Sequence, residues 1–419
     1  MESTSAATDH VGALELVPVG ELAGLEAAVR SQEARYLADL ERLVNTDCGS
    51  YTPTGVDQVG AFVAGLLRES GARVETRPDP DGRLGATVIG TWDGERGTPG
   101  GPRLLLIGHM DTVFDPGTAA ERPFAIDAAG IAHGPGVTDM KSGLLAGLYA
   151  MAVLERRGRL PFERVTFVAN PDEEIGSPSS TPHIRAIAAD ADAALVLECA
   201  RANGDIVSSR KGILDAQIAI DGRAAHAGVE PEKGRSAVLA AADLVTRLHA
   251  LNGRWDGVTV NVGVINGGTR PNVVAERCSL EVDIRAIRRA DLESAEREVR
   301  SLLGSLVVPD ASADLVEMAR WWPMEKLDRS GRLVEHAQAI AGGLGFEVHD
   351  AATGGASDAN TTSGMGVASL DGLGPIGGRD HSPDEYLEIA SVVPRTTLLA
   401  GLILAIGRDP VIRRWREAG

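Results

Sequence analysis

Five residues of the kind that bind divalent metal ions occupy loop positions after apolar strands in this sequence. They are two histidines, His109 and His381, and three carboxylates, Asp139, Glu174 and Glu198. Imidazole nitrogen and carboxylate oxygen are common ligands of zinc and related ions. Five such ligands are too many for one tetrahedral site, but they suit two metal ions that share a bridging carboxylate. The sequence therefore predicts a site for two metal ions.

Glu173 stands next to a predicted ligand and is left over as a base. A hydrolase with two metal ions needs a polarised carbonyl, an activated water and a group that moves the proton. We therefore expect a two-metal hydrolase in which Glu173 moves the proton of the activated water. Asp111 follows His109 by two residues and is expected to accept the other ring proton of that histidine. We therefore count Asp111 with Glu173 among the catalytic residues.

Each of these residues, considered alone, is also compatible with an ordinary structural role. His109 is compatible with a hydrogen-bonded turn, and Asp139 precedes a predicted helix and is compatible with a helix N-cap. Glu173 and Glu174 are compatible with a charged loop. Glu198 is more informative, because it ends the apolar segment 193–197, where an unpaired charge is costly. The set as a whole favours the metal site.

The elements that carry these residues alternate between apolar strands and helices. Helical patterns cover about 21–45, 56–69 and 143–157, and apolar strands are expected at about 72–77, 85–91, 103–108, 164–169 and 193–197. This alternation predicts an α/β domain whose sheet is at least partly parallel.

The pattern changes near residue 210. Strands are expected at 213–220, 258–265, 279–284 and 315–319, with helices at 236–250 and 289–303. This is the strand-helix-strand-strand-helix-strand order of a ferredoxin-like domain. It lies between the fourth and fifth predicted ligands. We therefore expect a discontinuous metal-binding catalytic domain, residues 1–209 and 320–419, with residues 210–319 inserted.

Composition limits the partners and the location of the protein. The formal net charge of -18 over 419 residues argues against nucleic acid and against an anionic membrane surface. Three widely spaced cysteines, Cys48, Cys199 and Cys278, predict reduced, buried thiols. The first twenty residues show no signal-peptide pattern, and we expect no apolar run of the roughly 18–20 residues that a bilayer requires. These features predict a soluble, cytoplasmic protein.

Six segments form a set that occurs in this order in one group of enzymes. The segments are Leu105–Val113, Gly134–Lys141, Pro171–Ser177, Gly222–Gly228, Gly267–Asn272 and Gly354–Asp358. Together they resemble the dinuclear-zinc exopeptidase family that includes bacterial glutamate carboxypeptidase, acetylornithine deacetylase and succinyl-diaminopimelate desuccinylase. The resemblance runs from about residue 30 to the C-terminus and is greatest to glutamate carboxypeptidase. It implies a zinc-exopeptidase-type α/β catalytic domain with a mixed central sheet, interrupted by a ferredoxin-like α+β lid and dimerisation domain.

The resemblance also implies how the site is assembled. Two zinc ions per chain are expected, and cobalt or manganese could replace them in such a carboxylate-rich site. Asp139 would bridge the two ions, His109 and Glu198 would bind one of them, and Glu174 and His381 would bind the other. The resemblance supports Glu173 as the general base. It further implies a cis peptide bond between Asp139 and Met140.

The inserted domain would supply the remaining residues of the site. In dimeric relatives the counterpart of His226 reaches the partner's active site and stabilises the oxyanion; the alternative is a surface histidine in a glycine-rich turn. Asn272, Arg285, Gly355 and Arg320 are expected to bind substrate. Arginine suits a substrate carboxylate because its planar guanidinium pairs with that group bidentately. A homodimer through residues 210–319 is the expected assembly.

Three functions remain open at this point. The first is a carboxypeptidase or amidohydrolase that releases an amino acid with a free α-carboxylate, glutamate-like by overall similarity. The second, on the same fold, is a deacylase of small N-acyl amino acids or an aminopeptidase. The third is a non-catalytic binding protein. Glu173 argues against the third, because a binding protein does not need a base beside its metal ions.

Overall fold

The computed structural model describes residues 12–94 and 96–415, and the chain divides into two compact units. Residues 1–11, which belong to the segment without a signal-peptide pattern, lie outside the described residues. The first unit comprises Met1–Ser208, Lys326–Ala351 and Ser357–Gly419, and the second comprises Ser209–Glu325 and Ala352–Ala356. The predicted boundary after residue 319 falls inside strand β12 (Ser312–Trp321) and is therefore wrong by several residues.

The first unit is built on a mixed six-stranded sheet in the order β1-β2-β6-β3-β7-β14. Its strands are β1 (Arg73–Arg77), β2 (Thr87–Trp92), β3 (Arg103–His109), β6 (Arg164–Asn170), β7 (Ala193–Val196) and β14 (Ala368–Leu370). Strands β6, β3, β7 and β14 run parallel, whereas β1 and β2 pair antiparallel. The predicted mixed sheet is confirmed. Because β6, β3 and β7 are parallel neighbours, the residues that follow them meet at one edge of the sheet.

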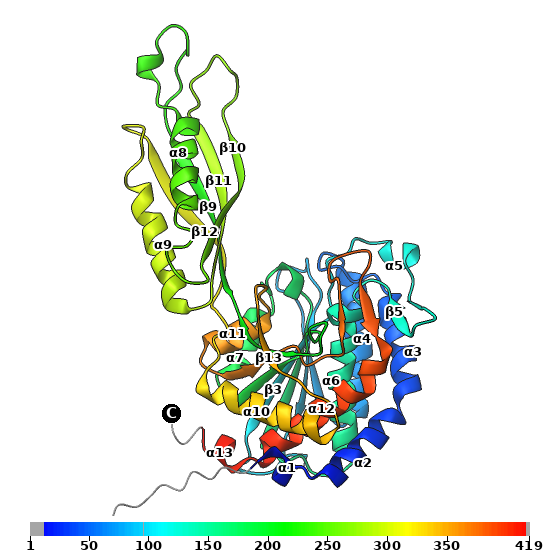
Figure 1. Cartoon of the computed structure of the whole chain (residues 1–419). Coiled ribbons are helices and arrows are strands. Elements are labelled where there is room, and N and C mark those ends of the chain that lie inside the picture. The colour runs from blue at the N-terminus through cyan, green and yellow to red at the C-terminus, as the bar shows by residue number, and fades with distance from the viewer. Residues whose placement is uncertain (1–11, 95, 416–419) are drawn as a thin grey trace, which may run out of the picture. The chain divides into compact units, whose positions relative to one another are not determined.

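Helices cover both faces of this sheet. Figure 1 shows α4 (Pro53–Glu69) and α6 (Gly143–Glu155) on one side, with α7 (Thr181–Ala188) and α11 (Asp358–Gly364) on the other. The expected helix at 21–45 is instead two helices, α2 (Val19–Arg30) and α3 (Glu33–Val44). The hydroxyl of Ser31 donates to the Ala28 carbonyl oxygen at 2.7 Å, which offers the backbone a local alternative to helix continuation. The remaining helices of this unit are α1 (Ala13–Leu16), α5 (Thr118–Glu121), α10 (Asp328–Gly343), α12 (Ile389–Arg408) and α13 (Pro410–Arg413).

Two helical segments are long and apolar enough to cross a membrane, so the expectation that no such run exists is wrong. They are Val137–Glu155, which contains α6, and Ile389–Arg408, which is α12. However, 89% and 83% of their apolar windows are buried inside the protein. α12 packs against α6, α2 and α10. Both helices therefore have the burial of core helices in a globular unit.

Two small sheets bring distant parts of the chain together. One has the order β15-β16-β5-β4, with β15 (Gly377–Gly378), β16 (Tyr386–Glu388), β5 (Ile131–His133) and β4 (Ala125–Ile126). It pairs the segment around His381 with the segment that precedes Asp139. The other sheet consists of β8 (Ile206–Arg210) and β13 (Asp350–Thr353), which span the two points, after Ser208 and after Ala351, at which the chain passes from the first unit to the second.

The second unit is an antiparallel four-stranded sheet in the order β10-β11-β9-β12, packed with two helices. The elements are β9 (Gly212–Asp221), α8 (Ala237–His249), β10 (Thr259–Gly267), β11 (Arg277–Ala286), α9 (Arg289–Leu303) and β12. This connectivity and order are those of a ferredoxin-like fold. The unit has its own core, which includes Leu214, Ile218, Leu244, Leu280 and Leu292. It can therefore be stable through its own packing.

The three cysteines, Cys48, Cys199 and Cys278, are free and buried, as predicted. Burial raises the pKa of the Cys48 and Cys199 thiols, so both remain protonated at neutral pH. Protonated, buried thiols are poor nucleophiles.

Candidate active site

His109 is the last residue of β3 and is only 1% exposed. Its Nδ1 lies 2.9 Å from the main-chain carbonyl oxygen of Asp111 and 3.4 Å from the Asp111 carboxylate. The predicted contact between His109 and Asp111 is thus present, but the shorter distance is to the main-chain carbonyl oxygen of Asp111 and not to its carboxylate. Because a carbonyl oxygen can only accept, Nδ1 must carry the proton. In a neutral ring, Nε2 therefore presents a lone pair.

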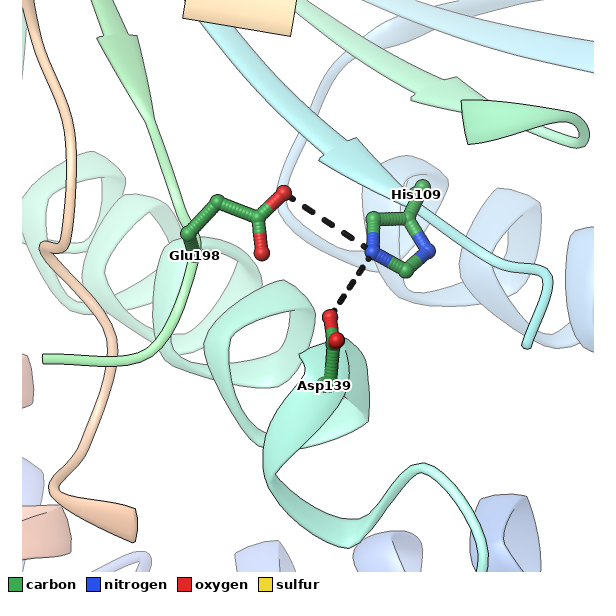
Figure 2. Close-up of side chains that lie close together, drawn as sticks. All are labelled: His109, Asp139 and Glu198. Atoms are coloured by element: carbon green, nitrogen blue, oxygen red, sulfur yellow. Dashed lines mark hydrogen bonds and ion pairs between the residues drawn. The ribbon is translucent and has the colours of Figure 1, made fainter. Parts of the chain in front are cut away.

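Two carboxylates face that lone pair (Figure 2). Nε2 of His109 lies 3.2 Å from Oδ1 of Asp139 and 3.8 Å from Oε1 of Glu198. Asp139 belongs to the turn Val137–Ser142 before α6, and Glu198 follows β7. All three groups can supply a lone pair, so they converge favourably only if a proton or a metal ion lies among them. These three residues have the chemistry of a metal site.

A second cluster uses the other oxygen of Asp139. Nε2 of His381 lies 3.1 Å from Oδ2 of Asp139 and 3.0 Å from Oε2 of Glu174. The two clusters, His109–Asp139–Glu198 and Asp139–Glu174–His381, each bring three potential ligand atoms within metal-binding reach. Asp139 is common to both. It does not serve as a helix cap, because α6 has no side-chain cap.

The electrostatics of the two clusters favour positive charge. Hydrogen bonds to Asp139 and Glu174 raise the pKa of His381 to about 11. Burial opposes protonation of His109, yet Asp111, Asp139 and Glu198 raise its pKa well above the usual range. Burial alone would raise the pKa of Asp139, but contacts with both histidines hold it below the usual range. A site that attracts protons this strongly also attracts metal cations.

Glu173 lies beside these ligands without belonging to either cluster. Burial, followed by the charge of Glu198, raises the pKa of Glu173 well above its usual range. Among the described residues its carboxylate has no hydrogen-bond partner, so it is available to a reacting molecule. A carboxyl group with a raised pKa is suited to take up and release a proton near neutral pH.

Asp111 has a structural task that the sequence did not reveal. Its fully buried carboxylate accepts hydrogen bonds from the backbone N–H groups of Glu173 at 3.1 Å and Glu174 at 3.2 Å. It also accepts one from the Ser50 hydroxyl at 2.6 Å. Asp111 therefore fixes both the His109 ring and the backbone of the two adjacent glutamates. The expected cis peptide bond between Asp139 and Met140 is present.

Two further buried carboxylates hold the loops of the site and were missed. Glu385 accepts three backbone N–H groups of residues 136–139, and burial raises its pKa to about 7. Asp358 accepts from the Ser177 hydroxyl at 2.7 Å and from the Asn170 side chain at 2.8 Å, at the two ends of the loop that carries Glu173. Only the nearness of Glu385 to His381 and the position of Asp358 in a family-like segment could have singled them out.

The other predicted site residues lie in the second unit. His226 is exposed and pairs with Val273, and the carbonyl oxygen of Asn272 accepts from Ala227 N–H at 3.0 Å. The structure thus brings His226 and Asn272 together in adjacent loop segments. Nδ1 of His226 accepts from Gly228 N–H at 3.2 Å, which leaves Nε2 at the surface.

Both arginines that were predicted to bind substrate already have partners. Arg285 Nε lies 3.0 Å from Asp283, and its Nη1 donates to the carbonyl oxygen of Gly354 at 3.0 Å. Arg320 is paired with Glu296 and Glu317 at 2.7 and 2.6 Å. These two carboxylates neutralise the charge of Arg320.

The predicted residue Gly355 lies in the segment 352–356. Its carbonyl oxygen accepts from Arg210 Nη1 at 3.2 Å. A glycine contributes only backbone groups, and this contact engages one of them within the second unit.

Two ligand clusters that share a carboxylate, at the edge of an α/β sheet, suit a hydrolase that uses two metal ions. Residues 105–405 match the peptidase family M20/M25/M40, and the chain belongs to this family. It is therefore a hydrolytic enzyme, as the resemblance of its motifs implied.

Curated relatives cover nearly the whole chain. The chain is 30% identical to carboxypeptidase G2 of Pseudomonas sp. (strain RS-16) over 387 residues, or 91% of each protein. It is 26% identical to acetylornithine deacetylase of Edwardsiella ictaluri, covering 90% of this chain and 98% of that enzyme. A tripeptidase from Staphylococcus aureus has a similar fold, with a TM-score of 0.73 at 21% identity over 90% of this chain and 99% of its own. The predicted family and fold are confirmed.

Proposed function

We propose that this enzyme is a dinuclear metal hydrolase that cleaves the amide bond of a C-terminal or N-acylated amino acid, in the manner of a glutamate carboxypeptidase. The observation that carries the proposal is the orientation of Asp139. Its two carboxylate oxygens face two different histidines, at 3.2 and 3.1 Å. A side chain placed in this way suits a bridge between two cations.

His109 and Glu198 would complete one ion site, and Glu174 and His381 the other. Two bound zinc ions, or cobalt or manganese in their place, would polarise the amide carbonyl and acidify a water molecule. Glu173 would take the proton of that water and deliver it to the leaving nitrogen, consistent with its raised pKa and its lack of a hydrogen-bond partner among the described residues. Asp111 would keep Glu173 and Glu174 in place through their backbone N–H groups.

We assign recognition of the substrate carboxylate to the second unit. Arg285 holds its guanidinium between Asp283 and the Gly354 carbonyl, so part of its hydrogen-bonding capacity is engaged. A substrate carboxylate would compete with Asp283 for the guanidinium N–H groups of Arg285. Asn272 stands near His226, and both would approach a substrate together. Similarity to carboxypeptidase G2 favours a free α-carboxylate, and similarity to acetylornithine deacetylase supports the deacylase alternative.

We also propose a homodimer formed through the second unit, with His226 of one chain completing the site of the other. Large apolar side chains are exposed on this unit: Val229, three residues after His226, is 74% exposed, Leu239 of α8 is 58% and Ile265 of edge strand β10 is 53%. α8 packs against β10, so these elements are neighbours. Exposed apolar side chains beside an unpaired strand edge suit a protein interface. The free, buried cysteines are consistent with a cytoplasmic location.

A substrate panel tests this function. Zinc-supplemented enzyme is incubated with N-acyl amino acids, dipeptides with a blocked N-terminus and dipeptides with a blocked C-terminus, and released amino acids are quantified. We expect release of the C-terminal amino acid from N-blocked substrates and none when the α-carboxylate is amidated. The Glu173→Ala variant, purified identically, controls for contaminating hydrolases. Preferential cleavage of C-blocked dipeptides would show an aminopeptidase. Cleavage of only the N-acyl amino acids with small, acetyl-type acyl groups would show a deacylase.

A further inference from the structure

Glu385 is a buried carboxylate that binds only backbone. It is 1% exposed and lies four residues after His381. Its Oε2 accepts from the N–H of Gly136 at 2.9 Å, and its Oε1 accepts from the N–H groups of Thr138 and Asp139 at 2.9 and 3.0 Å. In the described part of the chain no lysine or arginine pairs with it. Three hydrogen bonds from backbone N–H groups therefore offset part of the cost of burying this carboxylate.

These three hydrogen bonds all converge on one short turn. The turn includes Asp139, whose two oxygens face His109 and His381. The turn departs from a regular helix at two of the positions involved, because Gly136 adopts a positive φ of 71° and Asp139 has non-helical dihedral angles. The carboxylate of Glu385 thus sets the direction of the backbone from which the Asp139 side chain projects.

The same residue also belongs to the segment that carries the last predicted ligand. Glu385 directly precedes β16, which pairs with β5, and β5 in turn leads into the turn of Asp139. His381 and Asp139 meet at 3.1 Å, although they are far apart in sequence. Strand pairing brings the two segments together, and Glu385 adds a direct link between the loop of His381 and the backbone of Asp139.

We propose that Glu385 is a positioning residue that holds Asp139 and His381 at the separation required for a shared metal ion. This inference rests on the proposed function only in requiring that the two clusters bind metal. Glu385 would not touch metal or substrate itself. Partners that orient ligands typically change metal affinity or activity by about 10–100-fold when they are lost.

Glu385→Gln is the sharpest test, because it keeps the size of the side chain. One of the two acceptor oxygens becomes an NH2 group, which must face at least one of the three N–H donors. The matched control is Asp409→Asn, which alters another buried carboxylate of the first unit. Asp409 is 1% exposed, accepts from Val411 N–H and pairs with Arg332 and His336, outside both ligand clusters.

Zinc-loaded wild-type and variant proteins are titrated with a chromophoric chelator of known affinity, and the release of each zinc ion is measured. The absorption spectrum of cobalt-substituted protein reports the geometry of the ligands, and thermal unfolding reports stability. We expect Glu385→Gln to weaken binding of at least one ion by about 10–100-fold and to change the cobalt spectrum. Asp409→Asn should lower the unfolding temperature but leave zinc affinity unchanged.

Wild-type affinity for both ions in Glu385→Gln would overturn the proposal, even if its unfolding temperature fell as much as that of the control. If Glu385→Gln does not fold, Glu385→Asp replaces it, since it keeps the charge but shortens the reach by one methylene. Weakened zinc binding in that variant supports the proposal, and unchanged binding rejects it. A wild-type protein that binds no metal ion would instead refute the proposed function, and this inference with it.

Discussion

Asp139 cannot be replaced by a chemically similar residue without loss of one of its two contacts. Asparagine would keep the shape but offer a single acceptor oxygen, whereas the structure directs one oxygen to His109 and the other to His381. The neighbouring glutamates divide their tasks more simply. Glu174 lies 3.0 Å from His381 Nε2, whereas Glu173 belongs to neither cluster, so these two adjacent carboxylates are expected to differ in their effect on metal content.

Glu173→Ala should remove most turnover and leave the metal ions in place. Loss of a positioned proton-transfer group lowers the rate by about 10²–10⁴-fold. Atomic emission should still find about two metal ions per chain, since Glu173 belongs to neither cluster. Glu174→Ala is the matched neighbour and should lose metal as well as activity. Normal turnover in Glu173→Ala would refute the role as base, and a loss of metal would make Glu173 a ligand.

The ligand types could be predicted from sequence because a charged side chain at the end of a buried apolar strand is costly unless a partner or a metal ion compensates it. The contacts that orient these ligands could not be predicted. Asp111 uses its carbonyl for the His109 ring and its carboxylate for two backbone N–H groups, a division that residue type does not encode. Glu385 was overlooked because a carboxylate that binds backbone has no characteristic spacing. Partners of backbone groups depend on tertiary contacts that appear only after folding.

Helix α6 and strand β7 approach so closely that only glycine fits at Gly143. A Cβ atom at this position would lie 1.8 Å from the carbonyl oxygen of Leu197. Gly143 begins the helix that follows Asp139, and Leu197 precedes Glu198. The spacing between helix and strand therefore also sets the spacing between two predicted ligands of the same ion.

Gly143→Ala should push α6 away from the end of β7. We expect a loss of about 1–3 kcal/mol in stability, as in other overpacked cores, together with reduced activity and zinc affinity. Gly65→Ala in α4 is the matched control, because nothing lies within 4 Å of its Cβ position. It should raise stability by up to about 1 kcal/mol through helix propensity. Thermal unfolding and activity of both variants test this; equal stability of the two would contradict the close approach.

Element types and approximate limits followed from hydrophobic patterning, because burial imposes a period of two on strands and a helical stripe on helices. The order of strands did not follow. β3 lies between β6 and β7, and β14 joins the sheet only after the whole second unit has intervened. The break at Ser31 was also hidden, since the apolar stripe continues through it although α2 ends at Arg30 and α3 begins at Glu33. Local hydrophobic patterns therefore predict neither the order of strands in a sheet nor a break within a continuous apolar stripe.

At the scale of the whole molecule, the proposal that His226 acts in a partner's site makes a genetic test possible. His226→Ala and Glu173→Ala are each expected to be nearly inactive, the former by loss of an oxyanion donor worth about 2.7–4 kcal/mol. In a mixed dimer, one site lacks both groups and the other has both. Random pairing makes about half of the dimers mixed, so about a quarter of wild-type activity should return.

Co-expression with two different affinity tags isolates the mixed dimer, and each single variant purified alone is the control. Sizing experiments on the wild type establish whether a dimer forms. A mixed dimer that stays inactive, or a fully active monomer, would show that His226 does not act across subunits. Exposed Leu239 and Ile265 provide a second control, because polar substitutions there should weaken the dimer without touching the ligand clusters.

The insertion of one unit inside the other separates the order of translation from the order of assembly. The second unit has its own core and is complete in the nascent chain, apart from Ala352–Ala356, once Glu325 has emerged from the ribosome. The first unit then still lacks β14 and His381. Since domains tend to fold as units during synthesis, the inserted unit can fold first. A chain released early would then carry a folded inserted unit beside an incomplete set of metal ligands.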